Sequence, residues 1–196
     1  MRDIAWDDME WLHEPPSAVV RAGALEVTTG DKTDFWRKTG YGFINHNGHF
    51  LGGTFSGDAA VEVAFGADFT EQFDQAGLML YGGPDTWLKA GVERSDGQLY
   101  ASVVATVRHS DWSVAPLPAR AAGGVLTFRA SRKNDAVTVR YRIGDEAGWQ
   151  MLRLAYLPSE AELRAGPMCC SPTRAGLVVN FESVRQGPPD AKLHED

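Results

Sequence analysis

Long apolar runs are absent from this sequence. Nowhere do roughly 18 apolar residues follow one another, the length that a membrane-spanning helix requires. The first residues, Met-Arg-Asp-Ile-Ala-Trp-Asp-Asp, contain neither an apolar run nor a small-residue cleavage site, so we expect no secretory signal. No Asn-x-Ser/Thr acceptor for a glycan occurs. These absences predict a cytoplasmic protein that does not use a membrane.

Cysteine is scarce, and its placement argues against a disulfide framework. The two cysteines, Cys169 and Cys170, are adjacent. Neighbouring residues on a strand point to opposite faces, which is poor geometry for a bridge. We expect two reduced thiols that fill space in the interior, in keeping with the cytoplasm.

Clustered positive charge is also missing. The formal net charge is -7, and the 19 Lys and Arg residues are scattered along the chain. A protein that follows a phosphate backbone usually gathers its basic residues on one face. Nucleic acid and anionic membranes are therefore not expected as partners.

The sequence lacks helical periodicity, and its apolar residues instead alternate with a period of two. No stretch of about 11 residues repeats at helical spacing, which excludes a phosphate-binding loop that opens a helix. Turn residues recur roughly every 8–12 positions, and Asp96-Gly97 between two apolar strands is a strong hairpin signal. The pattern predicts one all-β sandwich or barrel over residues 1–186. The residues that follow, 187–196, are expected to form a polar, flexible C-terminal tail.

The strand expected over residues 87–94 carries the most informative pattern. One of its faces is apolar and suits a core. The other face carries Trp87, Lys89, Gly91 and Glu93. An aromatic ring, an ammonium group and a carboxylate in one row would stack a sugar ring and bind its hydroxyls, with open space above the glycine. The alternative is a solvated sheet face with a weak ion pair.

Three other regions place polar and aromatic residues near this strand. The strand expected over 74–81 should pair with it, and Asp74 at its mouth would reach a ligand, cap a turn or pair with an arginine. Residues 108–113 are expected to form a loop that rims a groove, or an Asx turn in which Trp112 tucks inward. Residues 31–37 and 44–50 add Asp34, Trp36, His46 and His49.

The sequence gives little support for a metal site or for nucleophilic catalysis. His46 and His49 with Asp34 or Asp111 come nearest to a ligand set, but they fall on turn residues without diagnostic spacing. No Gly-x-Ser-x-Gly elbow occurs, and the cysteines lack an arranged base. We assign no metal ligand and no cofactor.

A glycosidase would need two carboxylates on either side of the scissile bond, about 5–5.5 Å apart for retention or about 6.5–9.5 Å for inversion. Glu93 with Asp74 or Asp111 is the pairing that the sequence offers, with Lys89 adjusting the charge of Glu93. The Glu-x-Asp-x-x-Glu strand motif of many jelly-roll glucanases is missing. This absence weakens the hydrolase hypothesis.

Several segments, taken in their order along the chain, resemble those of a known family. They are Thr33-Asp34-Phe35-Trp36, Asn47-Gly48-His49-Phe50-Leu51, Asp74-Gln75-Ala76-Gly77-Leu78-Met79, Trp87-Leu88-Lys89-Ala90-Gly91-Val92-Glu93, Ser110-Asp111-Trp112-Ser113, Arg153-Leu154-Ala155 and Gly166-Pro167-Met168-Cys169-Cys170-Ser171-Pro172. In this order they resemble the concanavalin-A-like family of domains of unknown function that includes the yeast regulation-of-enolase protein. The resemblance implies a two-sheet antiparallel jelly-roll sandwich of the lectin/glucanase type, with a groove on its concave face. It implies no established reaction, and carbohydrate is the ligand expected by analogy within this fold class.

Three hypotheses for function follow. The first is a binding module that takes a carbohydrate-like small molecule in the concave groove. The second is a glycoside hydrolase or lyase that uses Glu93 as acid or base, and the third is a protein-interaction domain in metabolic regulation. The residues assigned to the groove are Asp34, Trp36, His49, Asp74, Trp87, Lys89, Glu93, Asp111, Trp112 and Arg153, of which Lys89 and Glu93 would form the floor and the three tryptophans the stacking walls.

Overall fold

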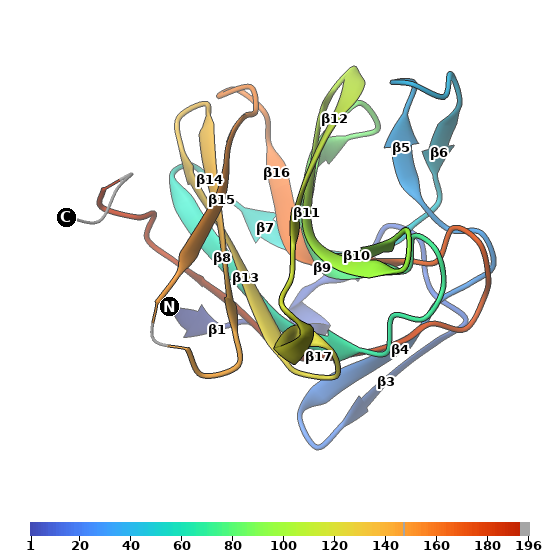
Figure 1. Ribbon diagram of the computed structural model, residues 1–196. Coiled ribbons are helices and arrows are strands. Elements are labelled where there is room, and N and C mark those ends of the chain that lie inside the picture. The colour runs from blue at the N-terminus through green and yellow to red at the C-terminus, as the bar shows by residue number, and fades with distance from the viewer. Residues whose placement is uncertain (147, 193–196) are drawn as a thin grey trace.

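Two antiparallel β-sheets packed face to face make up the computed structural model, which describes residues 1–146 and 148–192 (Figure 1). The eight-stranded sheet has the order β15 (Gln150–Tyr156), β14 (Ala136–Ile143), β13 (Leu126–Lys133), β8 (Ala59–Ala67), β17 (Val178–Gly187), β4 (Ala24–Thr28) and β3 (Ser17–Arg21), with β1 (Arg2–Asp3) also paired to β17. The seven-stranded sheet has the order β12 (His109–Pro116), β11 (Gln98–Val107), β10 (Thr86–Ser95), β9 (Gln75–Gly83), β16 (Leu163–Cys170), β7 (His49–Phe55) and β2 (Glu10–Trp11). The all-β, two-sheet jelly-roll sandwich is confirmed.

Alternating residues build the core between the sheets. Phe65, Phe128 and Phe181 of the eight-stranded sheet are fully buried, as are Leu78 and Leu88 of the seven-stranded sheet. Each is followed on its strand by a residue that points the other way. Burying side chains of this size contributes about 1.5–3 kcal/mol apiece, so the period of two fixes which face of each sheet turns inward.

The hairpin β10–β11 turns where Asp96-Gly97 predicted it. Both residues have left-handed backbones, with φ of 49° and 81°, as a two-residue hairpin turn requires. On the other side of β10, β9 pairs antiparallel with Gly91 opposite Gly77. The expected neighbour of residues 87–94 is therefore confirmed.

A third, small layer covers the outer face of the seven-stranded sheet. It is the hairpin of β5 (Phe35–Arg37) and β6 (Ile44–His46). In Figure 1 the strands β10 and β11 bend sharply, and this hairpin stands on the inner side of the bend. Beneath it lies a second apolar cluster of buried side chains, formed by Phe35, Phe50, Met79, Trp87, Val104, Met168 and Cys170.

Two glycines bring β9 and β10 unusually close. A Cβ added at Gly91 would lie 2.0 Å from the carbonyl oxygen of Ala76, and one added at Gly77 would lie 2.0 Å from that of Ala90. The open space expected above Gly91 is therefore wrong. The glycine is needed for the approach of the next strand, not for a ligand.

Residues 109–116 form strand β12 and not the expected loop. This strand pairs with β11 along its whole length, at the edge of the seven-stranded sheet. Most of its residues are at least partly exposed, because an edge strand can leave one face to water. Its sequence is accordingly polar and lacks the apolar alternation that marks a half-buried strand.

The C-terminal boundary also differs from the expectation. Strand β17 runs to Gly187, and Asp190 forms ion pairs with Arg129 and Arg140. The part of the tail that the structure describes is thus anchored to the eight-stranded sheet, while residues 193–196 lie outside the described part. Among the described residues, no helix has the length and apolar character needed to cross a membrane.

Candidate functional site

A cavity of about 320 Å³ lies between the β5–β6 hairpin and the outer face of the seven-stranded sheet. Its floor is polar and comes from Asp34, Gln75, Lys89 and Glu93. Its walls are mostly apolar. They include the aromatic residues Trp36, Tyr41, Phe43, Phe73 and Trp112.

Lys89 is the centre of the floor. Its side chain is buried, and its Nζ donates to Asp34 Oδ1 at 3.1 Å and to Gln75 Oε1 at 2.6 Å. Gln75 comes from β9, opposite Glu93 in the register of the sheet, whereas Asp34 comes from the segment that enters the hairpin. A buried ammonium group needs such partners, because an unpaired charge away from water is costly.

Glu93 lies four residues further along β10, with Gly91 between it and Lys89. Its Oε2 accepts a hydrogen bond of 2.6 Å from the hydroxyl of Ser102 on β11. The same hydroxyl oxygen accepts a bond of 3.0 Å from the indole N–H of Trp112. The chain of bonds fixes the ring of Trp112 at the cavity wall and leaves Glu93 on the floor.

Burial and neighbouring charges shift the pKa values of Glu93 and Lys89 on the cavity floor. Burial raises the pKa of Glu93 above its ordinary value, although the positive charge of Lys89 and the hydrogen bond from Ser102 oppose the shift. Burial is the largest influence on Lys89 and would lower its pKa, but the surrounding groups, Asp34 first among them, together outweigh burial and raise the pKa. Lys89 and Asp34 are thus a charge-balanced pair, and Glu93 is biased toward its neutral form.

The hairpin is held over the sheet by specific contacts. The side chain of Asn47 accepts from the backbone N–H of Asp34 at 2.9 Å, and the backbone N–H groups of Asn47 and Gly48 donate to the carbonyl of Asp34. Arg37 donates its backbone N–H to Ser110 Oγ at 2.9 Å. The Asn-Gly turn therefore places the carboxylate of Asp34 against Lys89, and β12 steadies the hairpin from the side.

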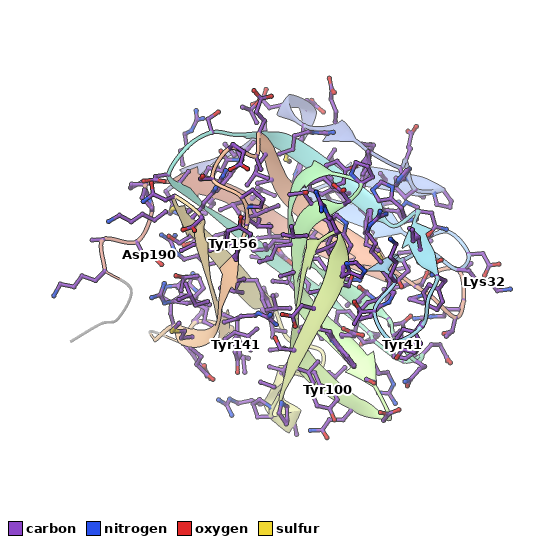
Figure 2. All side chains as sticks on the ribbon, turned by 90° about the horizontal axis from the view of Figure 1, so that it is seen from above. Lys32, Tyr41, Tyr100, Tyr141, Tyr156 and Asp190 are labelled. Carbon is purple, nitrogen blue, oxygen red and sulfur yellow. The ribbon has the colours of Figure 1, made fainter. Side chains whose placement is uncertain are left out.

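Aromatic rings crowd the mouth of the cavity. The rings of Tyr41 and Phe43 stack at 5.4 Å, and Trp36 meets Tyr41 edge-on at 5.6 Å. Tyr41 is 62% exposed at the hairpin tip; Figure 2 shows it at the side of the molecule away from Asp190. Phe73 has a φ of 64°, a backbone that bulky residues rarely adopt and that is often found at functional sites.

Five of the ten residues assigned to the groove meet at this cavity. They are Asp34, Trp36, Lys89, Glu93 and Trp112. The cavity is also lined by four residues that the sequence pattern did not assign to it, Gln75, Tyr41, Phe43 and Phe73. The parity of the strand 74–81 would have found Gln75, whereas Tyr41 and Phe43 lie in the loop of the β5–β6 hairpin and Phe73 lies in the loop before β9.

Trp87 and His49 lie away from the cavity, which corrects two assignments. Trp87 is buried under Phe35, with ring centroids 6.0 Å apart, so it cannot form a stacking wall. His49 is buried too. Its Nε2 accepts from the backbone N–H of Gly30, and its Nδ1 lies 3.0 Å from the carbonyl oxygen of His13, so both ring nitrogens serve the fold.

The remaining three assignments also fall outside the lining. The carboxylate of Asp74 is fully buried, accepts from the backbone N–H groups of Thr70 and Glu71, and pairs with Arg174. Asp111 and Arg153 pair with each other at 2.6 Å across β12 and β15. The carboxylate that shares the cavity with Glu93 is therefore Asp34, not Asp74 or Asp111.

Histidines gather at the base of the hairpin. His46 lies between His13, at 3.5 Å between ring nitrogens, and the hydroxyl of Tyr81, at 3.2 Å. Among the described residues, no group of three His, Cys, Asp or Glu side chains is arranged to hold a metal ion.

We expect stability to fall as the pH drops below neutrality because of His46 and His49. Burial lowers the pKa of both below the ordinary 6.5, so the unfolded chain takes up protons first. Their contribution is complete above pH 6.5 and is lost as the pH falls through the lowered folded-state pKa values. Urea unfolding midpoints measured from pH 7.5 to pH 5 should show the decline.

The His46→Gln variant should flatten this pH profile. The matched change His109→Gln, at the exposed start of β12, should leave the profile as in the wild type. Equal profiles for all three proteins would rule out the histidine cluster as the cause.

Comparisons with known proteins agree with the resemblance predicted from the ordered segments. A model of the family described as "Protein of unknown function (DUF1349)" matches residues 11–189. The chain is 36% identical over 187 residues to "Regulation of enolase protein 1" of Saccharomyces cerevisiae, across 95% of this chain and 92% of the relative.

Solved structures give the same answer for the fold. A functionally unknown protein from Saccharomyces cerevisiae matches with a TM-score of 0.89 and 34% identity, over 96% of this chain and 100% of that one. A xylan beta-1,4-xylosidase from Bacillus halodurans matches with a TM-score of 0.73 and 13% identity, over 95% of this chain and 39% of that one. At that identity the likeness shows the fold alone.

Proposed function

The chain belongs to the DUF1349 family of proteins of unknown function, and we propose that it is a binding protein whose cavity takes a neutral, carbohydrate-like small molecule. The observation that supports this most is the ring of aromatic side chains around a charge-balanced polar floor. Aromatic faces stack on the apolar faces of sugar rings, while amide, carboxyl and ammonium groups bind hydroxyls.

The charge and size of the cavity narrow the ligand class. Lys89 and Asp34 balance each other, and Glu93 accepts a hydrogen bond from Ser102, so the floor suits a neutral ligand that offers hydroxyl groups. The volume of about 320 Å³ is near the lower end of ligand sites, which span roughly 300–1,000 Å³. A mono- or disaccharide fits this range better than a polymer segment does.

A glycan and oligosaccharide array on the intact chain tests the proposal, followed by titration calorimetry of the best ligand. The Tyr41→Ala variant removes a ring from the mouth of the cavity and should weaken binding about tenfold, the equivalent of about 1.4 kcal/mol. Glu93→Gln and Lys89→Ala, which alter the floor, should weaken it further.

Tyr156→Ala is the matched control. Tyr156 is 56% exposed on β15, outside the cavity lining, so its loss should leave the affinity unchanged. Failure of every glycan to bind, or equal affinities for the two tyrosine variants, would refute the assignment of the cavity.

A second candidate is a glycoside hydrolase or lyase in which Glu93 acts as acid. Burial raises the pKa of its carboxyl, which is the direction of shift that general acids show, and Asp34 is a second carboxylate at the same cavity. Release of reducing ends from a bound oligosaccharide, lost in Glu93→Gln while binding persists, would favour this candidate over simple binding.

We further propose that the protein acts in the cytoplasm. Both cysteines are free and buried, which suits a reducing compartment.

A further inference from the structure

A row of charged side chains crosses the outer face of the eight-stranded sheet. Arg129 on β13 lies directly opposite Arg140 on β14 and opposite Glu62 on β8, and Glu62 lies opposite Arg185 on β17. Glu62 pairs with Arg129 at 2.8 Å and with Arg185 at 3.7 Å. Like charges directly opposite each other destabilise a strand pair, so an anion that contacts both Arg129 and Arg140 would stabilise this part of the sheet.

The C-terminal segment of the same chain supplies that anion. Asp190 Oδ1 accepts from Arg129 Nε at 2.8 Å and from Nη2 at 2.6 Å, and Oδ2 accepts from Arg140 Nη1. The backbone N–H of Asp190 donates to Ser131 Oγ at 2.8 Å. One residue of an extended peptide is therefore bound through its carboxylate and its amide together.

The site is well buried and has room beside its occupant. The side chains of Arg129 and Arg140 are 11% and 8% exposed, which strengthens their charge-assisted bonds relative to bonds in water. A cavity of about 390 Å³ adjoins Asp190 and is lined in part by both arginines and Trp149. Figure 2 places Asp190 on the side of the molecule opposite Tyr41, so this site is separate from the proposed ligand cavity.

We propose that Arg129 and Arg140 form a docking site for an acidic peptide, and that Asp190 is the intramolecular occupant that competes for it. The site takes a carboxylate at the guanidinium groups and a backbone N–H at Ser131, a combination that a peptide presents and a phosphate ion does not. Pro188 and Pro189 fix the backbone angles of the approach to Asp190 in an extended form. Because a tethered occupant acts at an effective concentration of about millimolar, an acidic segment of a partner binds well only when this tail is displaced.

The test uses the chain's own segment as the probe. A fluorescent, amidated peptide Gly-Pro-Pro-Asp-Ala-Lys, matching residues 187–192, is titrated by anisotropy into the wild type and into Asp190→Ala. The variant should bind this peptide at least about tenfold more tightly than the wild type does. The variant should also bind this peptide about tenfold more tightly than a peptide in which Asn replaces the Asp. Adding Arg129→Gln should abolish the binding, whereas adding Arg120→Gln, at an exposed arginine, should not.

A second measurement needs no variant, in case Asp190→Ala folds poorly. Trypsin cleavage after Lys192 of the wild type, followed by mass spectrometry, should accelerate when the Asp peptide is added in excess and not when the Asn peptide is added. Equal effects of the two peptides, no binding to a folded Asp190→Ala protein, or inorganic phosphate binding as tightly as the peptide would each overturn the proposal.

Discussion

Replacing Gly91 by alanine is expected to destabilise the protein strongly, although the change adds a single methyl group. The added Cβ would lie 2.0 Å from the carbonyl oxygen of Ala76, a backbone atom that cannot rotate away. We expect the free energy of unfolding to fall by about 3 kcal/mol, the upper end for overpacking. For a chain of this size such a loss lowers the Tm by roughly 6–12 °C, which calorimetry or circular dichroism would detect.

Gly148→Ala is the control for this experiment. A Cβ at Gly148 meets no atom within 4 Å, and its backbone is not left-handed, so its Tm should stay close to that of the wild type. Gly77→Ala should behave as Gly91→Ala does, because the two glycines lie opposite each other. A Gly91→Ala protein as stable as Gly148→Ala would mean that β9 and β10 do not approach as closely as described.

Replacing Asp74 by alanine should cost nearly as much, for an electrostatic reason. Its fully buried carboxylate accepts two backbone N–H groups and pairs with Arg174 at 2.5 Å. Removing one partner of a buried pair costs about 3–5 kcal/mol. We expect the lower end of this range, since Arg174 is partly exposed and can regain water. Denaturant titration at pH 7 measures the loss.

Two further variants separate the contributions to this effect. Asp74→Asn keeps an acceptor for the backbone N–H groups and should recover part of the stability. Asp111→Ala removes a carboxylate that is 72% exposed and paired with Arg153, and should change the stability by less than about 1 kcal/mol. If Asp74→Ala were as mild as Asp111→Ala, Asp74 would not hold the turn before β9.

Strand alternation and turn dipeptides predicted most of the sandwich. Asp96-Gly97 located the β10–β11 hairpin, and the apolar positions of 87–94 identified the face that packs inward, because both signals are local in the chain. Edge elements gave no such signal. Strand β3 is exposed at every residue, and β12 leaves one face to water, so neither carries the apolar pattern of a buried strand.

The candidate site, too, could be predicted only as far as its residues are linked by local patterns in the sequence. Parity along β10 predicted that Lys89 and Glu93 share a face, and the structure places both on the cavity floor. It could not tell which aspartate would join them, since Asp34 and Asp74 both precede strands. Asp34 reaches Lys89 because Phe35 packs on Trp87 and Asn47 fixes the turn, and these contacts join residues far apart in the sequence.

The two adjacent cysteines of β16 lie on opposite faces of its sheet, so their reactivities report on two different parts of the molecule. Cys169 lies in the core between the two sheets, while Cys170 lies in the cluster beneath the β5–β6 hairpin. Burial raises the pKa of both thiols, so neither reacts readily with an alkylating reagent until its surroundings open. Alkylation at Cys170 therefore follows lifting of the hairpin, and alkylation at Cys169 follows separation of the sheets. Two cysteines adjacent in the sequence thus distinguish local opening of the hairpin from separation of the sheets.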